Sequence, residues 1–136
     1  MVETKGVRPA IALLLALCLP LAPLPAPAAH LGPVLNQGQL VERMNGDQAP
    51  PLIDVRTPAE YQAGHIPGAV NIPLQEFQQR MSELSGYRDR EVVLYCESGM
   101  RASRGGQWLK SQGFQELRYL DGHMIAWRAA GLPTER

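Results

Sequence analysis

EVVLYCESGMRASRGGQWLKSQG, residues 91–113, is the stretch that decides the fold of this chain. After Glu91 the run to Tyr95 is continuous, apolar and rich in β-branched residues, which is typical of a strand buried on both faces of a parallel sheet. A short loop follows, and residues 100–112 then have the pattern of a helix that Gly113 ends. A strand, a tight loop and a helix in direct succession predict one unit of an α/β fold.

The same alternation continues on both sides of this stretch. Strands are predicted at residues 34–35, 51–55, 69–72, 91–95 and 117–120, and helices at residues 36–44, 57–63, 74–84, 100–112 and 124–130. We therefore expect an α/β fold with an open, mostly parallel sheet of about five strands and helices on both faces. Ligands of such sheets bind beyond the carboxyl ends of the strands, where Asp54 and Cys96 both lie.

The first 28 residues have the layout of a secretory signal peptide. Lys5 and Arg8 precede a wholly apolar run at residues 11–19, and residues 26–28 offer the small side chains that a signal peptidase requires. Prolines interrupt the apolar run well short of the ~20 residues that cross a bilayer, which disfavours an uncleaved anchor. We expect cleavage after residue 28 and a periplasmic or secreted product with no stable membrane insertion.

Cleavage there would leave residues 29–136 as one domain. A lipoprotein anchored at Cys18 is disfavoured because Leu17 is too bulky for the position before a lipid-attachment cysteine. The full chain has 13 basic and 13 acidic residues, and cleavage would leave 11 and 12, a net charge of −1 (11 minus 12). This balance predicts no nucleic-acid partner. The histidines and the cysteine lack metal-ligand spacing, so neither a metal nor another cofactor is expected.

Cys96 would be the one cysteine of the mature domain. Exported proteins usually pair their cysteines as disulfides, so an unpaired cysteine indicates a reactive thiol or an intermolecular disulfide. A buried, inert cysteine is about equally compatible with the count alone. The position of Cys96 at the carboxyl end of a predicted strand favours the reactive thiol.

The loop that follows this strand suits a thiolate nucleophile. Its successive N–H groups can converge on the sulfur, and the helix N-terminus adds partial positive charge, both of which favour the thiolate. Arg101 supplies a cation that can hold an anionic substrate. We therefore assign Cys96 as the nucleophile. The candidate substrate-binding residues are Glu97, Ser98, Gly99, Met100 and Arg101.

Attack on phosphorus and attack on sulfur both fit such a loop. Tyrosine phosphatases place five residues between their cysteine and arginine, whereas four separate Cys96 from Arg101. The shorter loop makes a smaller cradle, which matches sulfur transfer better than a tetrahedral phosphate.

The chain resembles a rhodanese-like domain of the small, exported, single-domain bacterial kind. The matching segments are Leu52-Ile53-Asp54-Val55-Arg56, Glu60-Tyr61, the run GHIPGAVNIP at residues 64–73, the loop at residues 96–101, and Gly122, Trp127, Gly131 and Pro133. They occur in the expected order over nearly all of residues 29–136.

This resemblance implies a sulfurtransferase. A donor such as thiosulfate or a mercapto acid would give its outer sulfur to Cys96, and the resulting persulfide would pass the sulfur to cyanide or to a thiol, which a protein can carry. The alternative is a rhodanese-like module that carries sulfur with little turnover or only binds a protein. The presence of Cys96 favours activity.

Three residues depart from the family pattern. Glu60 stands where some thiosulfate-using members have a substrate-binding arginine, Glu97 puts an acid inside the loop, and His123 replaces a frequent second glycine near the expected rim of the site. Asp54 and Arg56 are supporting residues, more often an ion pair than a device that orients the loop. The four-residue spacing of Arg56 and Glu60 also suggests an ordinary ion pair.

Overall fold

The computed structural model describes residues 33–136. The predicted signal peptide therefore lies outside the described residues. The elements are β1 (Val34–Leu35), α1 (Gln37–Asn45), β2 (Leu52–Asp54), α2 (Pro58–Ala63), β3 (Val70–Asn71), η1 (Leu74–Glu76), α3 (Met81–Leu84), η2 (Ser85–Tyr87), β4 (Val92–Tyr95), α4 (Met100–Ser111), β5 (Leu117–Leu120) and α5 (His123–Ala129), where η denotes a 3-10 helix. Among these elements, none is a helix with the length and apolar character needed to span a bilayer.

The five strands form one parallel sheet in the order β1-β5-β4-β2-β3. The central strand β4 pairs with β2 on one side and with β5 on the other, in a register that places Asp54 opposite Tyr95. The carboxyl ends of β2 and β4 therefore meet at one edge, and the chain from β4 continues directly into Cys96. The prediction of an α/β fold with a five-stranded parallel sheet is confirmed.

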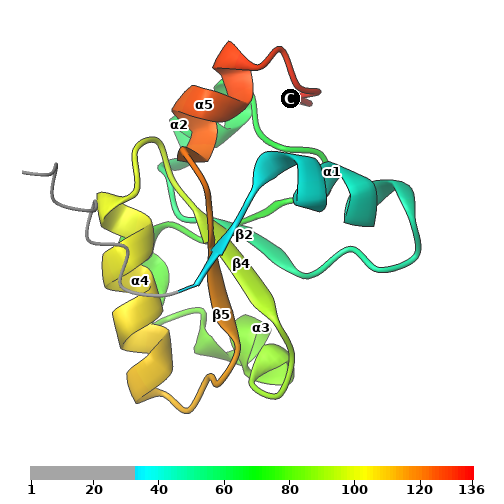
Figure 1. Ribbon diagram of the computed structural model, residues 1–136. Helices are drawn as coiled ribbons and strands as arrows, with labels where there is room; N and C mark the ends of the chain where they lie inside the picture. The colour runs from blue at the N-terminus through cyan, green and yellow to red at the C-terminus, as the bar shows by residue number, and fades with distance from the viewer. Residues whose placement is uncertain (1–32) are drawn as a thin grey trace, which may run out of the picture.

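Helices cover both faces of the sheet, as Figure 1 shows, with α4 and α3 on one side and α1 and α5 on the other. Side chains along β4 alternate between the two cores: Val92 and Leu94 join the core under α4, whereas Val93 and Tyr95 join the core under α5. All four are buried, because a strand sends successive side chains to opposite faces and here both faces are covered.

Local signals in the sequence set the boundaries of the elements next to the site. Thr57 caps α2 in a capping box with Glu60, and Pro58 occupies the first helical position. Gly68 has a φ of 78° and follows Pro67 in a turn that the N–H of Ala69 closes onto Ile66 at 3.1 Å, as a type II turn requires. Pro67 and Gly68 therefore form the turn between α2 and β3.

The continuous helix predicted at residues 74–84 is wrong. The chain instead forms η1, a series of turns and the short α3, with Arg80 at φ −105° and ψ 20° before α3. Long-range contacts determine this path: Phe77 is buried against α4, and Arg80 donates to the carbonyl of Asn71 at 2.9 Å. Such tertiary contacts override a helical pattern whose intrinsic preference is weak.

Two adjacent glycines in α4 allow the helix to pack closely. A Cβ atom on Gly105 would lie 2.9 Å from the ring of Phe77, and one on Gly106 would lie 1.9 Å from the hydroxyl oxygen of Tyr119 on β5. Glycine costs about 1 kcal/mol relative to alanine inside a helix. Here its lack of a side chain is what admits the two aromatic rings.

Candidate active site

Cys96 is the first residue after the central strand, and its sulfur receives a backbone hydrogen bond. The N–H of Gly99 donates to Cys96 Sγ at 3.0 Å. Cys96 is 1% exposed, so its thiol is recessed beneath the loop rather than presented at the surface. In the part of the chain that the structure describes, Cys96 is the free cysteine.

The start of α5 holds the loop from behind. The N–H of Met124 donates to the carbonyl of Cys96 at 3.0 Å, and the N–H of Ile125 donates to that of Glu97 at 3.2 Å. The first N–H groups of a helix have no partners within the helix. Here those of α5 donate to carbonyls of the loop, which is neither helix nor strand. The loop is thus fixed between β4, α4 and α5.

Gly99 is required by the conformation of the loop. Its φ of 119° lies in a region that side-chain-bearing residues rarely adopt. A Cβ atom there would also lie 2.7 Å from Nε2 of His123. Backbone conformation and the neighbouring ring therefore both demand glycine at the residue whose amide faces the sulfur.

His123 forms a wall of the loop. It is 3% exposed, it has a φ of 51°, and the N–H of Cys96 donates to its Nδ1 at 3.3 Å. Because Nδ1 accepts this bond, the ring proton of a neutral His123 resides on Nε2. The sequence placed His123 near the rim of the site, but the hydrogen bond that it accepts from the amide of Cys96 had no signal in the sequence.

Arg101 is paired with Glu60. Its Nη1 and Nη2 atoms donate to the two carboxylate oxygens of Glu60, each at 2.7 Å. This bidentate bond, followed by the hydrogen bonds from Thr57, holds the pKa of Glu60 at about 2, against an ordinary value of 4.5. The same bond raises the pKa of Arg101.

Asp54 and Arg56 form a buried ion pair at the end of β2. The Arg56 Nη2 atom lies 2.7 Å from Asp54 Oδ2, and both side chains are almost fully buried. The expected pairing of these two residues is therefore present. The ion pair suggested between Arg56 and Glu60 is wrong, because the tertiary fold directs Glu60 to Arg101 and Arg56 to Asp54.

Arg56 also reaches the loop, with Nη1 3.5 Å from Oε2 of Glu97. The other carboxylate oxygen of Glu97 bonds Arg128 of α5. Glu97 therefore links Arg56, just after β2, to α5 across the loop and does not extend freely into solvent.

The remaining predicted loop residues have different surroundings. Ser98 is exposed, and Met100 is 69% exposed at the first position of α4. The structure brings the amide of Gly99 onto the sulfur and pairs Arg101, the predicted anion-binding residue, with Glu60. Ser98 and Met100 follow Cys96 closely in sequence, and their roles in binding stay predictions.

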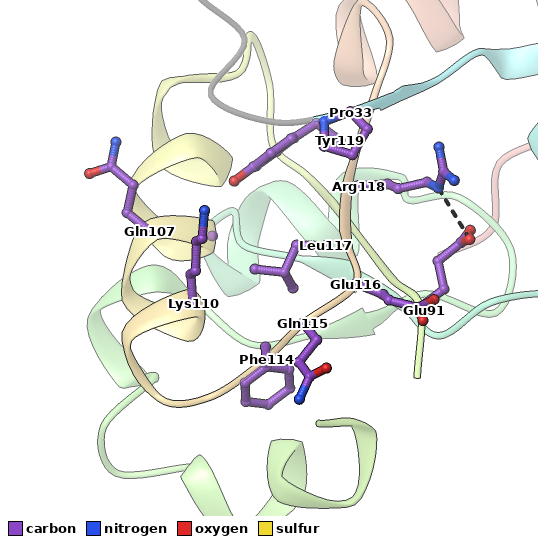
Figure 2. A pocket seen from close by; sticks show the side chains of 11 residues that line it. Pro33, Glu91, Gln107, Lys110, Phe114, Gln115, Glu116, Leu117, Arg118 and Tyr119 are labelled. Carbon is purple, nitrogen blue, oxygen red and sulfur yellow. Dashed lines mark ion pairs between the residues drawn. The ribbon is translucent and has the colours of Figure 1, made fainter. Parts of the chain in front are cut away.

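A separate pocket of about 310 Å³ lies between α4 and β5 (Figure 2). Lys110, Leu117 and Tyr119 are among its lining residues, and none of the residues assigned to the Cys96 loop is.

Within residues 33–136, no cluster of three or more His, Cys, Asp or Glu side chains has the arrangement of a metal site.

Comparisons with known proteins identify the family. The model of the rhodanese-like domain family matches residues 36–130. A sulfurtransferase from Allochromatium vinosum is 38% identical over 99 residues, which cover 73% of this chain and 91% of that protein. An HTH-type transcriptional regulator from Mycobacterium tuberculosis is 40% identical over 103 residues, which cover 74% of this chain but 44% of the regulator.

A solved structure agrees with these matches. The solution structure of a rhodanese-like domain from an Anabaena protein superposes with a TM-score of 0.68 at 32% sequence identity, covering 76% of this chain and 79% of that domain. The residues that the family model matches include strands β2 to β5, the Cys96 loop and the helices that hold it. The chain therefore belongs to the rhodanese-like domain family, which includes sulfurtransferases.

Proposed function

We propose that this protein transfers a sulfane sulfur through a persulfide on Cys96. The observation that carries the proposal is the amide of Gly99, which lies 3.0 Å from Cys96 Sγ at the carboxyl end of the central strand. A backbone donor in that position stabilises negative charge on sulfur, both in the attacking thiolate and in the persulfide that forms. The similarity to a sulfurtransferase over 91% of that relative's length supports the same conclusion.

The two half-reactions balance with no cofactor. The Cys96 thiolate attacks the outer sulfur of a donor such as thiosulfate, the donor's S–S bond breaks, and sulfite leaves with the electron pair. The persulfide anion is then attacked at its terminal sulfur. A cyanide ion leaves as thiocyanate, or a thiol leaves as a new persulfide after giving its proton to the regenerated thiolate.

Burial of Cys96 shapes this chemistry. With 1% of the residue exposed, Cys96 offers a donor little surface for contact. In return, a buried persulfide is shielded from water and from unintended thiols. We therefore expect general thiol reagents to modify Cys96 slowly and small sulfur donors to load it faster.

The experiment is intact-mass measurement after purified protein is mixed with thiosulfate. We expect a gain of one sulfur atom, its loss on addition of cyanide, and no gain in Cys96→Ser. Aryl phosphate should not be hydrolysed. A wild-type protein that gains no sulfur from any sulfane donor, or a Cys96→Ser protein that gains it equally, would refute the proposal.

A low-turnover sulfur carrier is the second candidate. Two of the large apolar side chains that the structure leaves exposed, Met100 (69%) and Ile125 (52%), belong to the segments that form the Cys96 loop and hold it. Exposed apolar side chains on these segments suit a thiol-bearing protein as acceptor. A carrier would load with one sulfur but release little thiocyanate over many cycles, so steady-state turnover with cyanide separates the two functions.

We also propose that the protein is exported, on the support of residues 1–28. Their basic start, apolar run and small residues at the expected cleavage position suit a signal peptide. Expression with residues 1–28 intact should yield a periplasmic or secreted protein whose N-terminal sequence begins near Ala29. Uncleaved protein in the cytoplasm would contradict export and leave the sulfurtransferase proposal untouched.

A further inference from the structure

We propose that Glu60 determines which sulfur donor loads Cys96, because it neutralises Arg101, the arginine at the end of the Cys96 loop. The inference rests on the proposed function and narrows its substrate class. The site favours donors with one negative charge or none, such as organic persulfides, over the thiosulfate dianion.

The first step of the argument is the geometry of Glu60. Both of its oxygens accept from Arg101 at 2.7 Å, and Oε2 also accepts from the N–H and the hydroxyl of Thr57 at 2.9 and 2.8 Å. The capping box of α2 thus holds the carboxylate in place before any ligand arrives. A bidentate carboxylate in this position occupies the fork with which arginine binds an anion.

The second step is that the neighbouring cations are paired as well. The Arg56 guanidinium is buried against Asp54 and lies 3.5 Å from Glu97, which also binds Arg128. Three arginines are therefore matched by three carboxylates around one loop. An incoming dianion meets no uncompensated positive charge among these residues, and to engage the Nη1–Nη2 fork of Arg101 it must displace Glu60.

The third step compares donors. Thiosulfate brings two negative charges beside a thiolate and loses the hydration of both, a cost that only a free cation offsets. A persulfide donor of the form R–S–SH brings one charge at most. The Cys96 thiolate attacks its outer sulfur, the donor's S–S bond breaks, and the departing R–S group keeps the electron pair and takes the proton. Surroundings without a free positive charge therefore weaken the binding of thiosulfate more than the binding of a persulfide.

Glu60→Gln is the variant that tests this. Glutamine fills the third position of a capping box as glutamate does, so α2 retains its cap while the charge is lost. We measure the donor concentration that half-saturates the rate of sulfur gain on Cys96, with thiosulfate and with hydroxyethyl persulfide. The value for thiosulfate should fall on the order of tenfold, as expected for release of one nearby cation. The value for hydroxyethyl persulfide should change by less than about twofold.

Two further variants sharpen the result. Glu83→Gln removes a carboxylate that pairs with Arg80 outside the loop, and it should leave both donors unaffected. Arg101→Gln in the Glu60→Gln background should restore the weak binding of thiosulfate, because the freed cation is gone.

The outcomes are distinct. An unchanged thiosulfate dependence in Glu60→Gln, or an equal shift for both donors, overturns the role of Glu60 while sulfur transfer stands. Failure of the wild-type protein to load from either donor overturns sulfur transfer and this inference together.

Discussion

The N–H of Gly99 donates to Cys96 Sγ at 3.0 Å, from a backbone conformation that favours glycine. Gly99→Ala should displace this amide, because a Cβ atom would lie 2.7 Å from Nε2 of His123 at a φ of 119°. Loss of a hydrogen bond of this kind slows the reaction by about tenfold. The rates of sulfur gain from thiosulfate and of alkylation by iodoacetamide check this expectation.

Gly86→Ala is the control for that variant. A Cβ atom at Gly86 would contact nothing within 4 Å, so loading and alkylation should match those of the wild-type protein. Unaltered sulfur gain in Gly99→Ala, with circular dichroism showing a native fold, would remove the amide of Gly99 from the mechanism.

The buried pair of Asp54 and Arg56 should be important for stability. Asp54→Asn leaves the Arg56 guanidinium buried beside a neutral amide, and loss of one partner of such a pair costs about 3 kcal/mol. Urea unfolding measures the difference. Glu76→Gln, which weakens a partly exposed pair with Arg80, should change the free energy of unfolding by less than about 0.5 kcal/mol. Equal effects of the two variants would contradict the special role of burial.

The contact between Gly106 and Tyr119 predicts an unusual helix substitution. Alanine ordinarily stabilises a helix relative to glycine by about 1 kcal/mol. Gly106→Ala should instead destabilise the protein by about 2 kcal/mol, because its Cβ would lie 1.9 Å from the hydroxyl oxygen of Tyr119. Adding Tyr119→Phe should recover part of that loss, as measured by thermal unfolding. A stabilised Gly106→Ala protein would show that the ring moves away freely.

The pair of Glu60 and Arg101 predicts a contribution to stability that acid removes. The pKa of Glu60 falls from 4.5 to about 2 on folding, so the contribution is fully present above pH 4.5 and disappears as the pH falls towards about 2. Both side chains are about one-third exposed, which limits it to about 1 kcal/mol. Urea unfolding over this pH range measures the free energy of unfolding, which should fall less with acid in Glu60→Gln than in the wild-type protein. Glu42→Gln, a variant of an exposed glutamate, should behave like the wild type. If the free energy of unfolding fell with pH by the same amount in all three proteins, the predicted contribution of the Glu60–Arg101 pair would be contradicted.

The sequence predicted the elements around the nucleophile well because their signals are local. The β-branched run before Cys96, the capping residues Asn36 and Thr57, and the glycine after Pro67 act over a few residues. The helix expected at residues 74–84 failed for the opposite reason. Its backbone follows the burial of Phe77 against α4, a contact between segments far apart in the chain.

By itself, then, the sequence determined the succession of strands and helices and the position of Cys96 between a buried strand and a helix, since periodicity and capping act over neighbouring residues. The resemblance of its motifs indicated the family. Only the tertiary structure decided the partners of the charged side chains. Spacing paired Arg56 with Glu60, yet Glu60 binds Arg101, 41 residues away. An ion pair depends on which elements the fold brings together, and the burial of apolar side chains on the two faces of the sheet determines how these elements pack.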